Sequence, residues 1–549
     1  MEIEKSVVRL IEQSLKKHWD LPALSDYQGT TYQYKDVARR IAKMHIIFDG
    51  CGIKRGDKIA ICGRNSANWG TLFMAIISYG ATAVPILHDF KPDNIHNIVN
   101  HSDSKLLLVG DVVWEGLNEQ EMPNLEAIIL ISDFSILYSN KKSVKTLRDR
   151  LNEEFGKRYP KNFRPEHIHF FTENTNDLMM ISYTSGTTGF SKGVMLSYAN
   201  LHSNIEFACE VLAELHAGDS VVSMLPMAHM YGMSFEFIYE FCKGCHIHFL
   251  TRTPSPKVIL NAFAEIKPRL IIAVPLIIEK IYRNNILPVI SKPTVKALLA
   301  LPVVDKQICH QILKKLNDTF GNNFIEIIIG GAGLNQEVER FFKKIGFAYT
   351  VGYGMTECAP IISYSDRRET SLYACGKAVI NMEIRIDSDD PAHTVGEIQV
   401  RGKNVMLGYY KNEEATKNMF TPDGWMKTGD LGVIDKNGYL YIKGRSKNLI
   451  LGASGQNIYP EEIEDKINNM PYVVESIVLD RHGKLVGLVY PDFPKLQEDG
   501  KNVQEEMENM RVAVNLILPS FSQIAEIRFY PEEFEKTPKR SIKRFMYQV

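Results

Sequence analysis

A twelve-residue stretch, YTSGTTGFSKGV at 183–194, constrains this chain more than any other part of its sequence. Every residue from 184 to 189 is glycine, serine or threonine, and a lone cation, Lys192, follows. Glycines let backbone N–H groups turn toward an anion, hydroxyls add donors, and a lysine supplies a point charge. Apolar residues before the stretch (178–183) predict a strand, and residues 194–207 predict a short strand leading into a helix. The sequence therefore predicts a polyphosphate-binding loop.

The spacing excludes a Walker A loop, because Ser191 stands five residues after Gly186 and Lys192 is followed by Gly193. A flexible turn is the alternative for a shorter match. The full string resembles the phosphate loop of the adenylate-forming superfamily, which includes acyl-CoA synthetases, adenylation domains and luciferases. This resemblance implies ATP contacts, with a catalytic role for the first residue, at Thr184, Ser185, Gly186, Thr187, Thr188, Gly189 and Lys192.

Length and composition point to a large protein with more than one domain, since 549 residues with 45% hydrophobic content exceed a single small core. A net charge of −1 gives no global field toward nucleic acid or an anionic membrane. No secretory signal pattern or membrane-spanning run is present, so we expect a cytoplasmic protein, with peripheral membrane contact left open. Eight cysteines scattered over such a chain are expected to be reduced thiols.

The segment CKGCH at 242–246 matches the CxxCH pattern of haem attachment. That attachment belongs to exported proteins, and the run CHIHFL alternates as a strand does. We therefore expect a structural strand and turn here.

Alternating helical and strand patterns over residues 20–110 are typical of a doubly wound α/β sheet. The sequence after Gly376 is rich in strand patterns. The superfamily resemblance implies a large AMP-binding (adenylation) domain at 1–446, built of doubly wound α/β subdomains and a strand-rich subdomain. A small mobile α+β lid at 447–549 follows.

The segment LPMAHMYG at 225–232 resembles the family motif at the acyl pocket and implies substrate contacts at His229, Tyr231 and Gly232. A buried, hydrogen-bonded histidine is the alternative. Methionine recurs at every third position from 224 to 233, either as core filling or as an adaptable wall for a flexible ligand. The long segment 283–321 occupies a region that relatives handling long acyl chains commonly enlarge, although an extra surface helix would give the same pattern.

Two further segments, FIEIIIGGAGLN at 324–335 and YTVGYGMTECAP at 349–360, follow buried-strand patterns with glycine-rich turns. Tyr353 lies between two glycines, which would bring a flat ligand close to the backbone. By resemblance, Gly331 and Ala332 line adenine, Tyr353 packs on it, and Gly354 and Met355 adjoin it. Thr356 meets the α-phosphate, and Glu357 acts in catalysis and holds Mg²⁺, which prefers hard oxygen ligands.

Residues 424–445 predict two strands joined at an Asp-Lys-Asn-Gly turn. By resemblance, Asp430 binds the ribose, Arg445 lies nearby and Lys447 is the hinge of the lid. The loop 452–457 would then swing toward the active site and border a CoA channel, with Gly455 and Gln456 as its residues.

This sequence matches the family least well at the position of the family's catalytic lysine. The C-terminal string EKTPKRSIKRF at 535–545 places Ser541 where that lysine is expected, flanked by Lys539 and Lys543. We favour Lys543 and keep Lys539 as the alternative.

The motifs together resemble a bacterial AMP-forming long-chain fatty acid-CoA ligase. The resemblance implies ATP, Mg²⁺ and coenzyme A, with a fatty acid as substrate and no nucleic acid partner. An acyl-carrier-protein ligase, or a CoA ligase for another carboxylic acid, shares every ATP motif. A nucleotide-binding pseudo-enzyme is the alternative outside enzymes, because serine stands at the expected lysine position.

Overall fold

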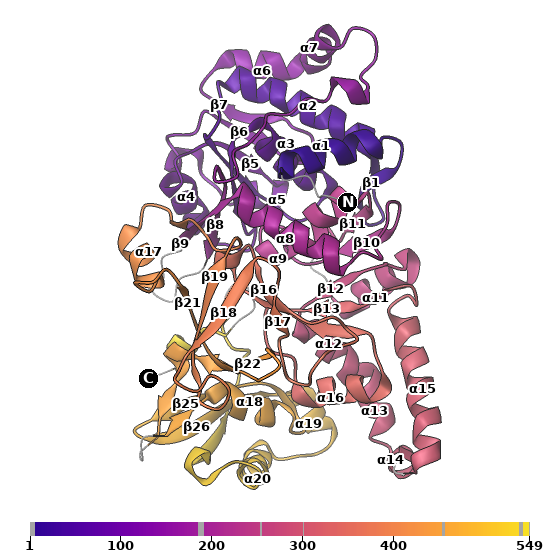
Figure 1. Cartoon of the computed structure of the whole chain (residues 1–549), viewed down its shortest axis with the longest axis vertical. Helices are drawn as coiled ribbons and strands as arrows, with labels where there is room; N and C mark the ends of the chain where they lie inside the picture. Colours follow the sequence, from indigo (N-terminus) through magenta and orange to yellow (C-terminus); the bar gives the residue numbers. More distant parts are fainter. Residues whose placement is uncertain are drawn as a thin grey trace.

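A computed structural model of the chain describes residues 6–184, 192–252, 255–299, 301–452, 456–536 and 542–547. The buried apolar residues form one core that ends at Leu440 and two smaller cores between Ile458 and Tyr547. Figure 1 shows the corresponding large domain and, at the lower end of the long axis, a small one. The predicted fold class, α/β with a small α+β region, is confirmed. The predicted boundary between residues 446 and 447 stays a prediction.

An eight-stranded sheet forms the centre of the large domain. Neighbouring strands from β8 to β6 are parallel, whereas β20, β9 and β7 pair antiparallel with their neighbours. The order across the sheet is β20 (Gly408–Tyr409), β9 (Lys192–Ser197), β8 (Leu178–Thr184), β4 (Thr82–Ile86), β3 (Lys58–Cys62), β5 (Ser104–Val109), β6 (Ala127–Leu130) and β7 (Ile136–Ser139).

Helices connect these strands, and their ends follow from the sequence. The helix α3 (Ala67–Tyr79) begins after Ser66, whose side chain accepts a hydrogen bond from the Trp69 N–H, and ends at Gly80 with φ +87°. A serine N-cap and a left-handed glycine are the common helix start and stop. Other helices of this part are α1 (Val7–Lys17), α2 (Tyr34–Cys51), α4 (Pro92–His101), α5 (Asp111–Trp114), α6 (Lys142–Asp149), α7 (Leu151–Arg158) and α8 (Tyr198–Val211).

Two further sheets complete the α/β part, and their strands pair in parallel except for β1 and β2, which pair antiparallel. The first has the order β10 (Ser220–Ser223), β11 (His246–Phe249), β1 (Pro22–Asp26) and β2 (Thr31–Gln33), and the second β12 (Ile271–Ala273), β13 (Ile327–Ile329) and β14 (Tyr349–Val351). The segment CKGCH covers the end of α10 (Tyr239–Lys243), a left-handed turn at Gly244 and the start of β11. The structure thus has the expected strand and turn, and all eight cysteines are free thiols.

The strand-rich part of the large domain is antiparallel. It contains β15 (Tyr353–Gly354), β16 (Ile361–Tyr364) and β17 (Lys377–Ala378), a four-stranded sheet of β18 (Met382–Asp387), β19 (Gly396–Gly402), β21 (Met426–Ile434) and β22 (Leu440–Arg445), and the helix α17 (Glu413–Met419). The strands β21 and β22 form the predicted hairpin, with Asp430 paired to Arg445.

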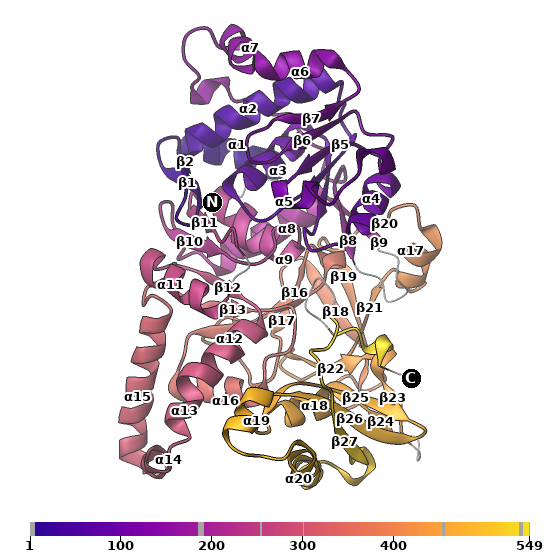
Figure 2. The same ribbon diagram turned by 180° about the vertical axis from the view of Figure 1, so that it is seen from behind.

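The long segment predicted at 283–321 is helical. It contains most of the π-helix η4 (Tyr282–Ile286), then α13 (Leu287–Ile290), α14 (Pro293–Leu299) and α15 (Pro302–Thr319). The helices α11 (Pro256–Ile266) and α12 (Pro275–Ile281) precede it, and α16 (Gln336–Ile345) follows β13. The long helix α15 runs along the outer edge of the molecule in Figures 1 and 2.

The small domain has a three-stranded sheet with helices. Its elements are β23 (Ile450–Leu451), β24 (Asn457–Ile458), α18 (Pro460–Asn468), β25 (Val473–Arg481), β26 (Lys484–Pro491), α19 (Phe493–Glu498), α20 (Val503–Asn515) and β27 (Glu526–Phe529). The last described residues lie near the boundary between the two domains in both views. None of the helices in the described ranges is long and apolar enough to cross a membrane.

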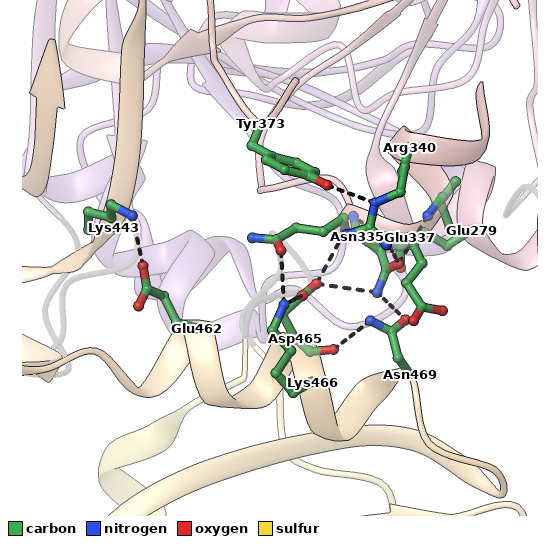
Figure 3. A network of polar contacts seen from close by, with 12 residues as sticks. Glu279, Asn335, Glu337, Arg340, Tyr373, Lys443, Glu462, Asp465, Lys466 and Asn469 are labelled. Carbon is green, nitrogen blue, oxygen red and sulfur yellow. Dashed lines mark hydrogen bonds and ion pairs between the residues drawn. The ribbon is translucent and has the colours of Figure 1, made fainter. Parts of the chain in front are cut away.

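Polar contacts dock the small domain on the large one. The backbone N–H of Asn335, at the start of α16, donates to Glu279, and its side-chain amide donates to Asn469 at 2.7 Å and to Asp465 at 3.3 Å. Lys466 donates to Gln336 at 2.9 Å. Figure 3 shows this network joining α18 to the start of α16.

A second anchor comes from η4. The Arg283 guanidinium donates to the backbone carbonyls of Asn468 at 2.6 Å and Val473 at 3.0 Å, so it binds the end of α18 and the start of β25. One side chain of the large domain thereby holds two points of the small domain.

We predict that Arg283→Ala loosens the docking of the small domain. Hydrogen bonds from a charged group contribute about 1.5–3 kcal/mol, so the variant should spend more time undocked. The measurement is the rate of limited proteolysis near residues 446–448, compared with the wild-type chain. Arg511→Ala is the matched control, because within the described residues Arg511 pairs with Glu508 of its own helix and with no group of the large domain. Equal rates in Arg283→Ala and the control would contradict the prediction.

Candidate active site

The two ends of the predicted phosphate loop lie side by side. Thr184 ends β8 and Lys192 begins β9, and the two residues are register partners in the antiparallel pair. The predicted loop residues between them, namely Ser185, Gly186, Thr187, Thr188 and Gly189, lie outside the described residues. Only the anchoring of the loop is therefore defined.

Lys192 lies over an aromatic ring. Its Nζ is 4.9 Å from the ring centroid of Tyr409, and the Tyr409 hydroxyl donates to Glu357 Oε1 at 2.9 Å. Tyr409 is a residue that sequence reasoning missed. The segment around it, residues 404–412, belongs to the strand-rich region predicted after Gly376, and a strand pattern does not reveal what its side chains touch.

The predicted adenine-lining turn follows β13. Gly331 has φ +88°, a conformation that glycine adopts without strain. At the preceding Gly330, an added Cβ would come within 3.1 Å of the Tyr231 ring, and the Tyr231 hydroxyl donates to the carbonyl of Ile328 at 3.0 Å. The structure thus brings Tyr231, predicted for the acyl pocket, against the turn that leads to Gly331 and Ala332.

Tyr353, Asp430 and Arg445 form one cluster, in which the tyrosine and the carboxylate are buried and the arginine side chain is half exposed. The Tyr353 hydroxyl donates to Asp430 Oδ2 at 2.6 Å, and Arg445 Nε lies 2.8 Å from Oδ1. Asp430 is only 4% exposed. Burial raises the pKa of Asp430, while the Arg445 charge and the Tyr353 hydrogen bond oppose that shift. A carboxylate has about four acceptor positions, so these two partners leave room for ribose hydroxyls.

The turn after Tyr353 is built for close backbone approach. An added Cβ at Gly354 would lie 2.1 Å from the carbonyl oxygen of Pro360, so only glycine fits. Met355 precedes the short 3-10 helix η5 (Thr356–Cys358), in which Thr356 is buried. The Glu357 carbonyl accepts from the Met406 N–H at 2.8 Å, which ties η5 to the segment before β20.

Glu357 fits the predicted Mg²⁺ ligand. Mg²⁺ in nucleotide sites is commonly held by one or two carboxylates together with phosphate oxygens and water. The Tyr409 hydroxyl donates to Oε1 of this carboxylate, and among the described residues no hydrogen bond to Oε2 is seen, so Oε2 suits a cation. The carboxylate oxygens of Glu357 are therefore suitable ligands for the Mg²⁺ that the superfamily resemblance implies.

The other predicted acyl-pocket residues lie at a helix start. His229 is the N-cap of α9 (Met230–Met233), and its Nδ1 accepts from the Tyr231 N–H at 3.3 Å. An added Cβ at Gly232 would lie 2.9 Å from the carbonyl oxygen of Pro226. The four methionines are all buried, which agrees with core filling and with a pocket wall alike; their positions are Met224, Met227, Met230 and Met233.

The predicted hinge residue and the C-terminal lysines lie far from Thr184 and Lys192 in the sequence. Lys447 lies in the short 3-10 helix η6 (Ser446–Asn448), directly after Arg445, and burial lowers its pKa. Gln456 precedes β24, whereas Gly455 lies outside the described residues. The Lys543 Nζ pairs with Glu535 at 3.0 Å within the small domain. Lys539 and Ser541 fall outside the described residues, so the structure does not decide between the two lysines.

These elements belong together in a known family. Residues 11–410, more than half of the chain, match the family described as AMP-binding enzyme. The chain is therefore a member of the AMP-binding enzyme family.

Individual relatives support this membership. The long-chain-fatty-acid–CoA ligase FadD15 of Mycobacterium bovis is 26% identical, over 95% of this chain and 91% of that protein. The peroxisomal long chain acyl-CoA synthetase 6 of Arabidopsis thaliana is 29% identical, over 93% of this chain and 76% of that protein. Among solved structures, ATP-bound MatB from Rhodopseudomonas palustris matches with a TM-score of 0.78 at 22% identity, over 98% of both chains. At this identity the structural match demonstrates the shared fold alone.

We predict that Asp430→Asn weakens ATP binding by roughly 10- to 100-fold, because hydrogen bonds to a charged group contribute about 1.5–3 kcal/mol. The amide can accept at only one of its two polar atoms, and it leaves the Arg445 charge without its partner. Isothermal titration with ATP measures the effect.

Asp435→Asn is the control for this variant. Asp435 lies in the turn of the same hairpin and accepts from the backbone N–H groups of Asn437 and Tyr439. Its replacement should leave ATP affinity unchanged. If both variants bind ATP as the wild-type chain does, Asp430 does not contact the nucleotide.

Proposed function

We propose that this protein is an AMP-forming fatty acid–CoA ligase that acts on medium to long acyl chains. The observation that carries the proposal is the convergence of Lys192, Glu357 and the Tyr353–Asp430–Arg445 cluster on elements that adjoin one another. Binding and activating ATP requires a cation, a carboxylate and a hydrogen-bond acceptor for the ribose hydroxyls. Membership of the AMP-binding enzyme family supports the same reading.

The first half-reaction joins a carboxylate to AMP. One carboxylate oxygen of the acid attacks the α-phosphorus of ATP, the bond to the bridging oxygen breaks, and pyrophosphate leaves. Thr184 and Thr356 would donate to phosphate oxygens, and Lys192 would neutralise charge on the departing pyrophosphate. Mg²⁺ held by Glu357 would supply further charge neutralisation when bound. Positioning and electrostatic stabilisation are the main contributions of proteins that transfer phosphoryl or nucleotidyl groups.

The second half-reaction requires the small domain to change its orientation. The thiol of coenzyme A attacks the acyl carbon of the acyl-adenylate, and AMP leaves as the thioester forms. In our proposal the small domain turns about Lys447, withdraws the C-terminal lysine and brings Gln456 toward the thiol. No protein nucleophile takes part in either step.

The acyl group is proposed from two features. Both relatives described above carry names of long-chain enzymes. The resemblance implies an enlarged region at 283–321 in long-chain enzymes of this family, and this segment is helical from η4 to α15. A carrier-protein ligase and a ligase for another acid share the ATP site, so only the acceptor and the acid distinguish them. The cytoplasm as compartment stays a prediction.

We predict carboxylate-dependent exchange of pyrophosphate into ATP, strongest with fatty acids of medium to long chain. Thioester formation with coenzyme A should follow, and exceed that with an acyl carrier protein. Exchange with no acid at all would contradict the ligase and favour a nucleotide-binding pseudo-enzyme. Exchange limited to short or aromatic acids would overturn only the acyl-chain proposal.

We further predict that Lys543→Ala lowers the exchange rate by about 100-fold, the size expected for losing one preorganised contact to the transition state. The ion pair of Lys543 with Glu535 is exposed, and such pairs are weak enough to break when the lysine is needed. Lys539→Ala is the paired comparison and should retain most of the activity. Survival of exchange in Lys543→Ala together with its collapse in Lys539→Ala would assign the role to Lys539.

A further inference from the structure

Tyr409 connects the two charged groups of the site. It lies on β20, the edge strand that pairs with β9 through Tyr409 and Val194. One face of its ring meets the Lys192 ammonium, and its hydroxyl reaches Glu357. The side chain is 5% exposed, so both contacts form away from bulk water.

The backbone around Tyr409 is held on both sides. The Tyr409 N–H donates to Thr416 Oγ1 at 2.8 Å, and the N–H of the next residue, Tyr410, donates to the Gly193 carbonyl at 2.8 Å. Met406, three residues earlier, donates to the carbonyl of Glu357 at 2.8 Å. A single short segment therefore fixes the distance between the start of β9 and η5.

The ring also separates opposite charges. Lys192 and Glu357 both lie against Tyr409, yet no ion pair joins them in the described structure. A direct pair would partly neutralise both groups. A lysine that binds phosphate needs its full positive charge, and a carboxylate that binds a divalent cation needs its negative charge.

The hydroxyl is suited to a fixed donor role. A tyrosine hydroxyl is ordinarily protonated at neutral pH, and the Tyr409 hydroxyl lies 2.9 Å from Glu357 Oε1, so it donates to the carboxylate. An ionised carboxylate only accepts hydrogen bonds. The Tyr409 O–H therefore orients the Glu357 carboxylate through Oε1 and leaves Oε2 for another ligand.

We propose that Tyr409 is a positioning residue of the adenylation site: its hydroxyl orients Glu357 for the divalent cation, while its ring holds Lys192 toward the phosphates and apart from Glu357. This inference rests on the proposed function, since it concerns the same ATP site. Partners that orient a metal ligand commonly change metal affinity or activity by 10- to 100-fold when they are replaced.

The test separates the hydroxyl from the ring. Tyr409→Phe keeps the ring and its contact with Lys192 but removes the donor to Glu357. We measure ATP affinity by isothermal titration at a series of Mg²⁺ concentrations, including none. The expected result is a Mg²⁺ requirement at least 10-fold higher, with Mg²⁺-free ATP affinity and melting temperature close to wild type. Pyrophosphate exchange should show the same increase in Mg²⁺ requirement. At saturating Mg²⁺ the exchange rate of the variant should differ less from that of the wild-type chain.

Two further variants complete the experiment. Tyr410→Phe is the matched control, because the Tyr410 hydroxyl donates to Asp103 at 2.8 Å and not to the site. It should behave as wild type. Tyr409→Leu removes the ring as well, so Lys192 can approach Glu357, and ATP affinity should fall both with and without Mg²⁺.

The outcomes distinguish this inference from the proposed function. A Tyr409→Phe variant with the wild-type Mg²⁺ requirement would overturn the positioning role alone. So would a variant that loses Mg²⁺-free ATP affinity and thermal stability together, because that result indicates packing. A wild-type chain whose ATP affinity does not respond to Mg²⁺ would overturn both the inference and the ATP site on which it rests.

Discussion

The antiparallel pairing of β8 with β9 is the constraint on which the candidate site depends. It places Thr184 opposite Lys192, so both ends of the phosphate loop start from one fixed point. The next strand, β20, comes from more than 200 residues later and pairs with the same β9. Because backbone hydrogen bonds set strand spacing, residues remote in sequence acquire a defined distance without any contact between their side chains.

Burial of charge makes this arrangement costly unless every charged group has a partner. Asp430 is almost fully buried and is held by Arg445 and by the Tyr353 hydroxyl. Lys192 and Glu357 meet the same tyrosine, one through the ring and the other through the hydroxyl. The site thus uses aromatic residues to stabilise charges that would otherwise pair with one another.

The fold class and the family were predictable because their signals are local. Glycine and hydroxyl spacing at 184–189, GYGMTE and TGD are strings whose chemistry can be read in sequence order. Tyr409 could not be predicted in this way, since its partners lie on β9 and η5 and are joined to it only by tertiary pairing. The same holds for Asn335 and Asp465, which look like ordinary surface residues until α16 and α18 meet. The choice between Lys539 and Lys543 stays open for a related reason: the C-terminal string carries several lysines and no local feature that separates them.

The kind of contact between the two domains affects how an enzyme of this family could carry out two half-reactions in succession. The apolar cores of the two domains are separate, and the described contacts between α18 and the large domain are mainly hydrogen bonds. Polar contacts can be exchanged for water at small net cost, whereas a shared apolar core could not be opened without losing its hydrophobic stabilisation. Asn335 begins α16 only four residues after Gly331, so one end of this polar network lies beside the predicted adenine-lining turn.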